Sequence, residues 1–538
     1  MRDNQLNQIV QTEPMVIPKT VRRDSKRVLT SGYAGKVLPL AYVPLLREDR
    51  VSRGRMRFNF EMMETGEMLM NAVNVTVQAH FVPHLAFERF GGSMDRLNRS
   101  YAGEPDSEGG PTIEYFRTDA FDRAWEITRT LGMHARTGQT VNTAVFEAYN
   151  AIVNQARKAA SSHLPLRDQF DKDLAAAFWK HTNMGHIVPD FDQAKIDGEV
   201  SLNLTGNLPV KGIYSRDGGG LTSTVTSESG NNFGGATFTT RDLVALDPDT
   251  DETNGFGAVY AEMAAANIQL SLSNIEMAKQ TAAFAQIRAQ YKNIDDDFII
   301  DLLMQGIRVP EEQMSQPILL AQGSTIFGYN RRYATDSGNL DESVTNGETS
   351  VELTVRTPPM NTGGIIMYTA QIVPEQLFER QKDYYFTETD VAKLPNTQND
   401  FLDPQKVTIV PKEHVDLDHT DPDGTFGYAP LNHQWNRNIP NVGGKYYRPQ
   451  VDAAFDEDRQ KIWANETVDP ELTEDFYLAN TIHHKVFAAT NQDPFEIIGS
   501  GEHDIVGNTV FGKGLQEASD DYEQIMAGVD TTLIDPKA

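Results

Sequence analysis

Two stretches of strictly alternating polar and apolar residues constrain the fold of this chain most. The first covers residues 55–62 and the second covers residues 73–81. A period of two over eight or nine residues is typical of a β-strand with one buried face. Parallel neighbours need a long crossover, so two such strands in close succession predict an antiparallel sheet. The apolar positions expected to face a core are Met56, Phe58, Phe60, Met62, Val73, Val75, Val77, Ala79 and Phe81.

Further strands and helices follow from the same kind of pattern. Residues 36–46 are apolar but contain Pro39 and Pro44, which predicts a bent or edge strand. The other expected strands are 200–204, 267–272, 349–356 and 363–373, the last of them apolar enough to be buried on both faces. Expected helices are a capped one over 142–160, a short one over 171–182, and a pair over 274–290 and 295–306.

Charge is distributed unevenly along the chain. Its 538 residues carry a formal net charge of −28, yet residues 1–60 hold twelve Lys or Arg against five Asp or Glu. That segment is +7, which leaves −35 on the rest. A large acidic excess favours solubility and disfavours general binding of nucleic acid. We therefore expect a basic N-terminal arm over 1–34, attached to an acidic body that forms a single domain over 35–538.

Long polar segments interrupt that body. Residues 101–141 and 212–256 are expected to be insertions, and the part from about 374 to the end is expected to be rich in loops. Residues 212–256 are rich in Gly, Ser, Thr and Asp, which predicts an outward projection rather than a core.

No residue pattern points to catalysis. The chain has no cysteine, which excludes disulfides, thiolate metal sites and cysteine nucleophiles. His414, Asp416, Asp418 and His419 could ligate a metal, but an exposed acidic loop explains them better. We expect no enzyme activity, no cofactor and no metal. The sequence also shows no apolar run of membrane-spanning length and no signal-peptide core, which predicts a soluble protein that is not exported by that route.

One cluster of basic residues is a candidate binding site. It lies in the expected arm, and its only acidic member is Asp24. The functional interpretation is contact with phosphates by charge alone, since no aromatic residue interrupts the cluster to stack on bases. The alternative is a solvated tail. The candidate contacts are Lys19, Arg22, Arg23, Lys26 and Arg27.

Four stretches, in order, resemble the major capsid protein of the microviruses, small tailless phages with circular single-stranded DNA. They are the block 32–83 ending in Phe81-Val-Pro83, the helix motif Phe146-Glu-Ala-Tyr149-Asn150-Ala-Ile152-Val-Asn154, the helix pair 274–306 followed by Val309-Pro310 and Gln316-Pro317, and the segment Phe426-Gly-Tyr428 through Val442-Gly443. The helix motif is the most specific. The segments 101–141 and 212–256 and the end from about 491 have no counterpart in the family pattern.

The resemblance implies a mainly β fold, an eight-stranded antiparallel jelly roll with large loop and helical insertions. It implies a structural protein of the virion, assembled in the host bacterial cytoplasm into a T=1 icosahedral shell of identical subunits. The implied partners are the encapsidated single-stranded DNA, small basic packaging and minor virion proteins, and a receptor on the host-cell surface. No membrane is implied. The alternative from another class is a carbohydrate-active or carbohydrate-binding β-sandwich protein, which would need a groove lined by carboxylates and aromatic rings.

Overall fold

The computed structural model describes residues 18–512 except for 68, 107–109, 181–183, 191–209, 212, 217–242, 247–259, 262–314, 334–342, 392–393, 403–405, 437–439, 448–460 and 464–466. The chain divides into two compact units. The first combines Met1–Phe191 with Asp295–Ala538, and the second is Asp192–Ile294.

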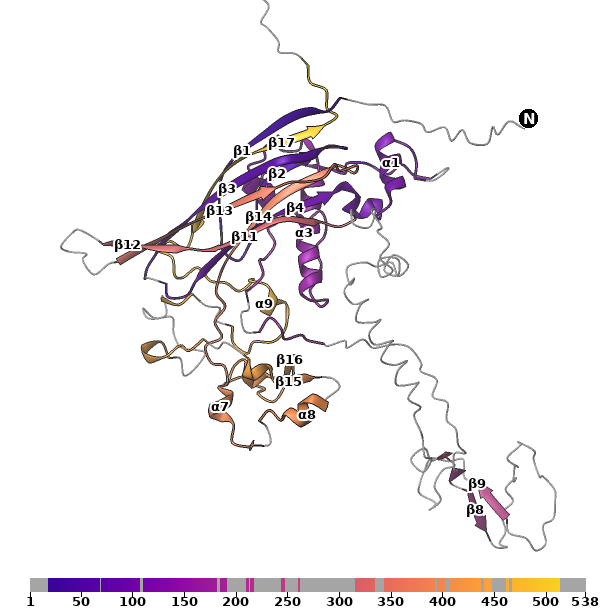
Figure 1. Ribbon diagram of the computed structural model, residues 1–538, viewed down its shortest axis with the longest axis vertical. Helices are drawn as coiled ribbons and strands as arrows, with labels where there is room; N and C mark the ends of the chain where they lie inside the picture. Colours follow the sequence, from indigo (N-terminus) through magenta and orange to yellow (C-terminus); the bar gives the residue numbers. More distant parts are fainter. Residues whose placement is uncertain are drawn as a thin grey trace, which may run out of the picture. The chain divides into compact units, whose positions relative to one another are not determined.

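The first unit is mainly β and contains two antiparallel sheets (Figure 1). The five-stranded sheet has the order β1 (Thr20–Gly32), β17 (Phe495–Gly507), β3 (Arg50–Thr65), β13 (Ser343–Val355) and β12 (Gly328–Tyr333). The four-stranded sheet has the order β11 (Ile318–Ile326), β4 (Val73–Pro83), β14 (Gly364–Pro374) and β2 (Val37–Leu45).

The alternating stretches form β3 and β4, and their apolar residues are buried as expected. All nine expected core positions are at most 1% exposed and belong to one core shared by the two sheets. The expectation that the two strands belong to one sheet is wrong. β3 lies between β17 and β13, whereas β4 lies between β11 and β14. Alternation determines which face is buried but not the pairing partner, and two apolar faces also cover each other when they pack across a core.

Three more expected strands are present. Residues 349–356 and 363–373 correspond to β13 and β14, and ten of the eleven residues of β14 are buried. β2 is an edge strand that contains Pro39 and Pro44. The start of its free edge is covered by residues of the segment expected as a helix over 171–182. Residues 175–177 are not helical there but pair with the chain at the start of β2, with Val37 N donating to Ala175 O at 2.8 Å and Ala177 N donating to Gly35 O at 2.8 Å. Covering an edge protects it from unwanted pairing.

Strands β11 and β12 connect the two sheets directly. Only Phe327, itself buried, separates the end of β11 from the start of β12. The chain therefore passes from the four-stranded sheet to the five-stranded sheet without a loop.

Helices cover the second face of the four-stranded sheet and create a second core. They are η2 (His84–Ala86), η3 (Glu88–Phe90), α1 (Met94–Ala102), α2 (Glu126–Leu131) and α3 (Ala144–Ala160). The N-cap of α3 is Thr143 rather than the expected Asn142, so the helix begins one residue later than predicted. The polar segment 101–141 is more than an insertion, because it forms α2 and the short pair β5 (Thr118–Ala120) and β6 (Thr140–Asn142), and it buries Phe121 and Ile127. Its few apolar residues are spaced too widely to show a period.

The strands β1 and β17 were not expected from the sequence. The expected arm ends at residue 34, but residues 20–32 are an edge strand of the five-stranded sheet. β17 lies in the part expected to be loops, and it pairs with both β1 and β3. Gly499 and Gly501 lower the strand propensity of β17, but a Cβ at Gly501 would lie 2.1 Å from Arg55 O. Close packing of β17 against β3 therefore requires glycine. The same glycine is the reason why the sequence does not predict this strand.

A lobe over residues 375–436 has its own small core. It contains α7 (Tyr384–Thr387), α8 (Thr397–Leu402), β15 (Val407–Pro411), η6 (Lys412–His414), β16 (Thr425–Pro430) and η7 (His433–Trp435). Val410, Val415 and Phe426 pack there with Phe476 from α9 (Glu474–Tyr477). The short helix η8 (Gly444–Tyr446) follows the lobe in the chain. The part from 374 onward is thus more ordered than expected.

Four short strands are described in the second unit. β8 (Ile213–Arg216) pairs with β9 (Leu243–Leu246), and β7 (Val210–Lys211) pairs with β10 (Tyr260–Ala261), both antiparallel. The expected strands 200–204 and 267–272, most of the segment 212–256, and the expected helices 274–290 and 295–306 lie outside the described residues.

Candidate nucleic-acid interface

The five basic residues singled out from the sequence lie on or just before β1, and the strand separates them onto two faces. Side chains of successive strand residues point to opposite sides. Arg22 and Lys26 lie on the half-buried side, and Arg23 and Arg27 lie on the exposed side. Lys19 precedes the strand and is exposed. The structure therefore does not bring all five together as one site.

Arg22 and Lys26 already have partners within the chain. Arg22 Nη2 donates to Pro44 O at 2.8 Å and to Asp49 Oδ2 at 2.7 Å. Asp49 is 1% exposed, so Arg22 is the cation that compensates the charge of a buried carboxylate. Lys26 Nζ lies 3.3 Å from Asp24 and 5.3 Å from the centre of the Tyr42 ring. Both side chains hold β1 in place.

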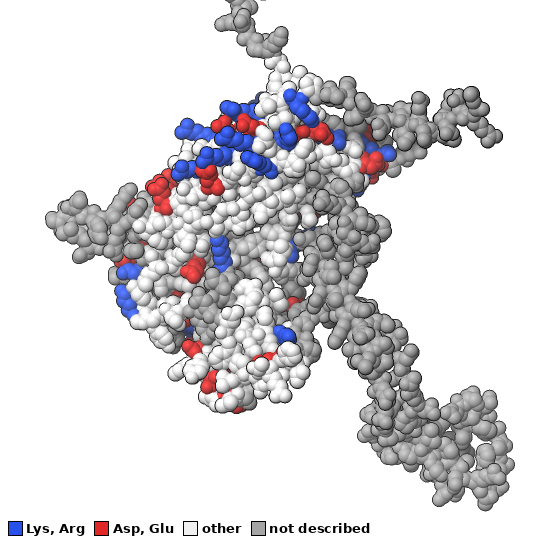
Figure 2. Space-filling view, viewed as in Figure 1, with Lys and Arg blue, Asp and Glu red and all other residues white. Residues whose placement is uncertain are grey.

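The exposed face of the sheet gathers further arginines. Asp504 of β17 lies opposite Arg23 of β1 on one side and Arg53 of β3 on the other. Ser500 of β17 lies in the same way between Arg27 and Arg57. Arg55 lies between Arg53 and Arg57 on the same side of β3. Figure 2 shows the basic side chains gathered over this part of the sheet, with acidic ones among them. We call Arg23, Arg27, Arg53, Arg55 and Arg57 the arginine face. The alternation of β3 predicts Arg55 and Arg57 on its polar side, but no residue pattern indicates that β1 lies two strands away.

Three carboxylates lie within the arginine face. Arg55 contacts Glu352 through Nε at 2.6 Å and Nη2 at 2.9 Å, and this hydrogen bonding holds the pKa of Glu352 below its ordinary value. Arg23 lies 3.2 Å from Asp504 and 3.5 Å from Glu502. These pairs are exposed and therefore weak.

The chemistry that the arginines of this face offer is the binding of anions. Arg27, Arg53 and Arg57 form no ion pair with any residue that the structure describes. An arginine side chain presents several N–H donors and no acceptor, and it stays charged at all ordinary pH values. The large exposed apolar residues on the outer side of β1 and β17 are Val21, Leu29 and Ile498, which are aliphatic and offer no ring for base stacking. The face fits phosphates or carboxylates.

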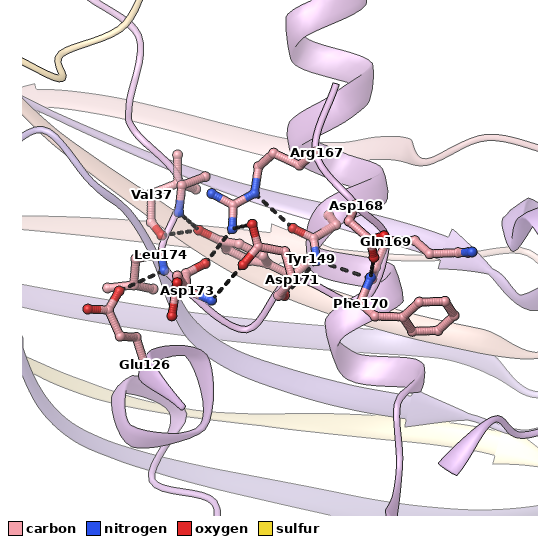
Figure 3. A network of polar contacts seen from close by, with 12 residues as sticks. Val37, Glu126, Tyr149, Arg167, Asp168, Gln169, Phe170, Asp171, Asp173 and Leu174 are labelled. Carbon is pink, nitrogen blue, oxygen red and sulfur yellow. Dashed lines mark hydrogen bonds and ion pairs between the residues drawn. The ribbon is translucent and has the colours of Figure 1, made fainter. Parts of the chain in front are cut away.

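The helix motif of α3 forms a second polar centre, shown in Figure 3. Tyr149 Oη donates to Val37 O at 2.7 Å and accepts from Ala175 N at 2.9 Å. Its hydroxyl therefore links α3 to β2 and to the segment around Ala175 that pairs with the start of β2. Burial raises the pKa of Tyr149 far above its ordinary value, so the hydroxyl stays neutral.

Two asparagines of the motif and Arg167 complete this centre. Arg167 Nε donates to Asn150 Oδ1 at 3.1 Å, and Asn154 exchanges two hydrogen bonds with the Arg167 backbone at 2.8 and 2.9 Å. Arg167 also lies 2.8 Å from Asp171, toward which it points in Figure 3. Every one of these contacts fixes backbone or positions another side chain. The motif therefore acts as scaffold.

The described part of the chain presents no candidate metal site. No group of three or more His, Asp or Glu residues there could hold a metal. In the loop suggested by the sequence, Asp416 and Asp418 both pair with Arg380. Among the same residues, no helix is both long and apolar enough to cross a membrane.

No protein-family model and no curated protein matches this chain. Its likeness to a family therefore rests on the four stretches of sequence.

Proposed function

We propose that this chain is a structural major capsid protein of the microvirus type, which self-assembles into a closed T=1 icosahedral shell around a circular single-stranded DNA genome. The observation that carries the proposal is the order of strands. In this proposal β1, β2, β3, β4, β11, β13, β14 and β17, numbered along the chain, correspond to strands one to eight of a jelly roll. One sheet then has the order 1-8-3-6 and the other 5-4-7-2, with β12 as an added edge strand.

This order supports the proposal because it is the arrangement of two Greek keys wrapped into one sandwich, the fold of many viral capsid proteins. Strands one and eight pair along thirteen residues, from Thr20 with Gly507 to Gly32 with Phe495. Strands two and seven pair in the opposite sheet. The fold alone does not define function, and the four family-like stretches supply the second support.

The arginine face is proposed to contact the phosphates of the enclosed DNA. Of the five residues expected from the sequence, Lys19, Arg23 and Arg27 remain candidates for this role, and Arg53 and Arg57 join them. Arg22 and Lys26 are proposed instead to hold the sheet together. Contacts of this kind depend on charge and do not read base sequence.

Assembly is tested on the full-length chain by light scattering and negative-stain electron microscopy. We expect closed, uniform shells. A monodisperse species near 60.0 kDa under gentle conditions would contradict the proposal and favour the carbohydrate-binding alternative. Symmetric self-association is the usual way in which identical chains cover their exposed apolar surface.

The DNA contacts are tested with Arg23→Gln, Arg27→Gln, Arg53→Gln and Arg57→Gln combined. Each lost phosphate contact should reduce the slope of log affinity against log salt by about 0.7, so the four together reduce it by about 3. The matched control removes four exposed charges elsewhere, with Arg123, Arg129, Arg136 and Lys158 each changed to Gln. Particles with the same complement of small basic proteins must be compared. An equal slope for both variants would refute the DNA contacts while leaving the shell intact.

A further inference from the structure

One row of the arginine face places two arginines on either side of a small hydroxyl side chain. Ser500 of β17 lies opposite Arg27 of β1 and opposite Arg57 of β3, and all three residues are exposed. Neighbouring strands lie about 4.8 Å apart, so the backbones of the two arginines are about 10 Å apart. Both long side chains can reach an anion above the serine, whose hydroxyl can donate a further hydrogen bond. We call Arg27, Ser500 and Arg57 the Ser500 clamp.

The charges around the Ser500 clamp favour an anion in this row. Neither of its arginines forms an ion pair with a residue that the structure describes. Glu352 lies opposite Arg57, but both of its carboxylate oxygens accept hydrogen bonds from Arg55. The next two rows have a carboxylate at their centre, Glu502 in one and Asp504 in the other. Five arginines against three carboxylates leave the arginine face with a net charge of +2, and only the clamp has a neutral centre between its arginines.

Two exposed aliphatic side chains lie beside the clamp. Leu29 of β1 and Ile498 of β17 are opposite each other in the adjoining row, and they are 70% and 51% exposed. Side chains on one face of a strand are two residues apart, so this row lies about 7 Å from the clamp. The other outward positions of β17 between Glu496 and Asp504 are polar. The aliphatic pair is therefore a small apolar surface on an otherwise polar face.

Carboxylates lie on the far side of the aliphatic pair. The row beyond it holds Glu496, Glu61 and Glu348, opposite one another on β17, β3 and β13, and all three are exposed. An anionic group is repelled from that side and attracted to the clamp. A ligand with one phosphate and one flat apolar part therefore has a single favourable orientation, with its phosphate at the clamp and its apolar part on the aliphatic pair.

We propose that the Ser500 clamp and the aliphatic pair together bind one nucleotide of single-stranded DNA, with the phosphate above Ser500 and the base lying flat on Leu29 and Ile498. This inference rests on the proposed DNA contacts of the arginine face and adds a contact to a base. Bases of a duplex are paired and stacked, so a single strand can turn a base onto the sheet at far lower cost. The contact uses the flat surface of the base, so it does not read sequence.

A phospholipid headgroup also combines a phosphate with apolar chains, but the charge of this chain disfavours it. A bacterial membrane surface that contains anionic lipids repels negative charge. The row of three glutamates lies directly beside the aliphatic pair, and the whole chain carries a net charge of −28. A flexible single strand can avoid these glutamates, whereas a flat membrane surface cannot.

Abasic DNA separates the base contact from the phosphate contacts. Full-length subunits are titrated before assembly with a fluorescent oligothymidylate and with an abasic strand of the same length, and fluorescence anisotropy gives the two Kd values. The parent chain should bind oligothymidylate about fivefold more tightly than the abasic strand, because burial of roughly 40 Å² of apolar surface has about that effect on affinity.

Two variants change the aliphatic surface in opposite directions. Leu29→Thr with Ile498→Thr should abolish the preference for oligothymidylate, because threonine keeps the strand propensity but lacks the aliphatic surface. Its affinity for the abasic strand should equal that of the parent chain, which also shows that the sheet is intact. Leu29→Trp should increase the preference, because a base stacks on an aromatic ring. The tryptophan variant tests the site even if the double variant does not fold.

Matched controls come from the same two strands. Val21 is 64% exposed on the same side of β1, but the row beside it has Asp504 at its centre. Val21→Thr should therefore keep the preference for oligothymidylate. Arg27→Gln with Arg57→Gln should weaken binding of both strands, because both carry the phosphates that the clamp contacts.

The outcomes distinguish the base contact from the proposed function. Equal affinity of the parent chain for the two strands would overturn the base contact and leave the phosphate contacts in place. A preference that survives Leu29→Thr with Ile498→Thr, is lost in Val21→Thr, or does not rise in Leu29→Trp would also overturn it. Binding of neither strand would refute the DNA contacts as well, while electron microscopy tests the shell separately. Tighter binding to phosphatidylglycerol vesicles than to oligothymidylate would identify a lipid ligand instead.

Discussion

Neighbouring residues of β1 have opposite roles, and Arg22 and Arg23 illustrate this. Arg22 pairs with Asp49, a carboxylate that is 1% exposed, whereas Arg23 is 66% exposed and pairs with carboxylates at the surface. Removing the partner of a buried charge leaves that charge unpaired, which is far more costly than losing a surface pair.

We expect Arg22→Gln to lower the free energy of unfolding by about 3 kcal/mol or more. Arg23→Gln should change it by about 0.5 kcal/mol or less. Urea unfolding of the two variants, followed by tryptophan fluorescence, measures the difference. Similar losses for both would show that the Asp49 pair does not stabilise the fold. Because of this pair, replacing Lys19, Arg22, Arg23, Lys26 and Arg27 together would confuse loss of the proposed DNA contact with loss of stability.

Two buried histidines make the fold sensitive to acid. Burial lowers the pKa of His80 and of His84 to about 4 from an ordinary value of 6.5. The unfolded chain therefore binds these protons first as pH falls. The stability that each neutral ring contributes is complete above about pH 6.5 and is lost progressively between there and about pH 4.

For His80 the expected loss between about pH 7 and about pH 5 is on the order of 2 kcal/mol. His80→Leu should remove that part of the pH dependence, as measured by urea unfolding at the two pH values. His134→Leu, at an exposed position, should leave it unchanged. If the pH dependence of His80→Leu matches that of the parent chain, the ring is not buried in its neutral form.

At the scale of elements, the period and composition of the sequence were enough to locate a strand or helix that has one apolar face. β3, β4, β13, β14 and α3 all show such a face, and all were located within a few residues or overlapped strongly. β1 could not be found in this way, because Arg22, Asp24 and Lys26 occupy its inner side and no apolar period exists. The arginine face was missed for a related reason. It depends on which strands are neighbours, and β17, from the far end of the chain, lies between β1 and β3 and pairs with both.

β17 also yields a prediction, because its glycines are required by packing. A Cβ at Gly501 would lie 2.1 Å from Arg55 O and 2.4 Å from Met56 Sδ, and a backbone oxygen inside a sheet cannot move aside. We expect Gly501→Ala to lower the free energy of unfolding by about 3 kcal/mol. Gly512→Ala, where no atom lies within 4 Å, should have little effect. Equal thermal stability of the two variants would contradict close packing of β17 on β3.

At the scale of the whole molecule, all strands of the two sheets lie outside the second unit. That unit, Asp192–Ile294, is inserted between α3 and β11. The composition of residues 212–256 predicts an outward projection, so limited proteolysis of assembled particles should cut within this segment first. Mass spectrometry of the fragments would locate the cuts. Early cleavage elsewhere, with 212–256 protected, would refute the outward placement.

The pairing of β1 with β17 also governs when the fold can form during synthesis. Among the described strands, β1 pairs only with β17. On the side of β3 that faces β1, the neighbouring strand is also β17. The ribosome must add more than four hundred residues between these two strands, which takes roughly half a minute to a minute and a half at about 5–20 residues per second. Until then the five-stranded sheet has a gap at its second position. An incomplete chain therefore cannot form the finished sandwich, so in the proposed assembly only polypeptides translated beyond β17 would be able to join a particle.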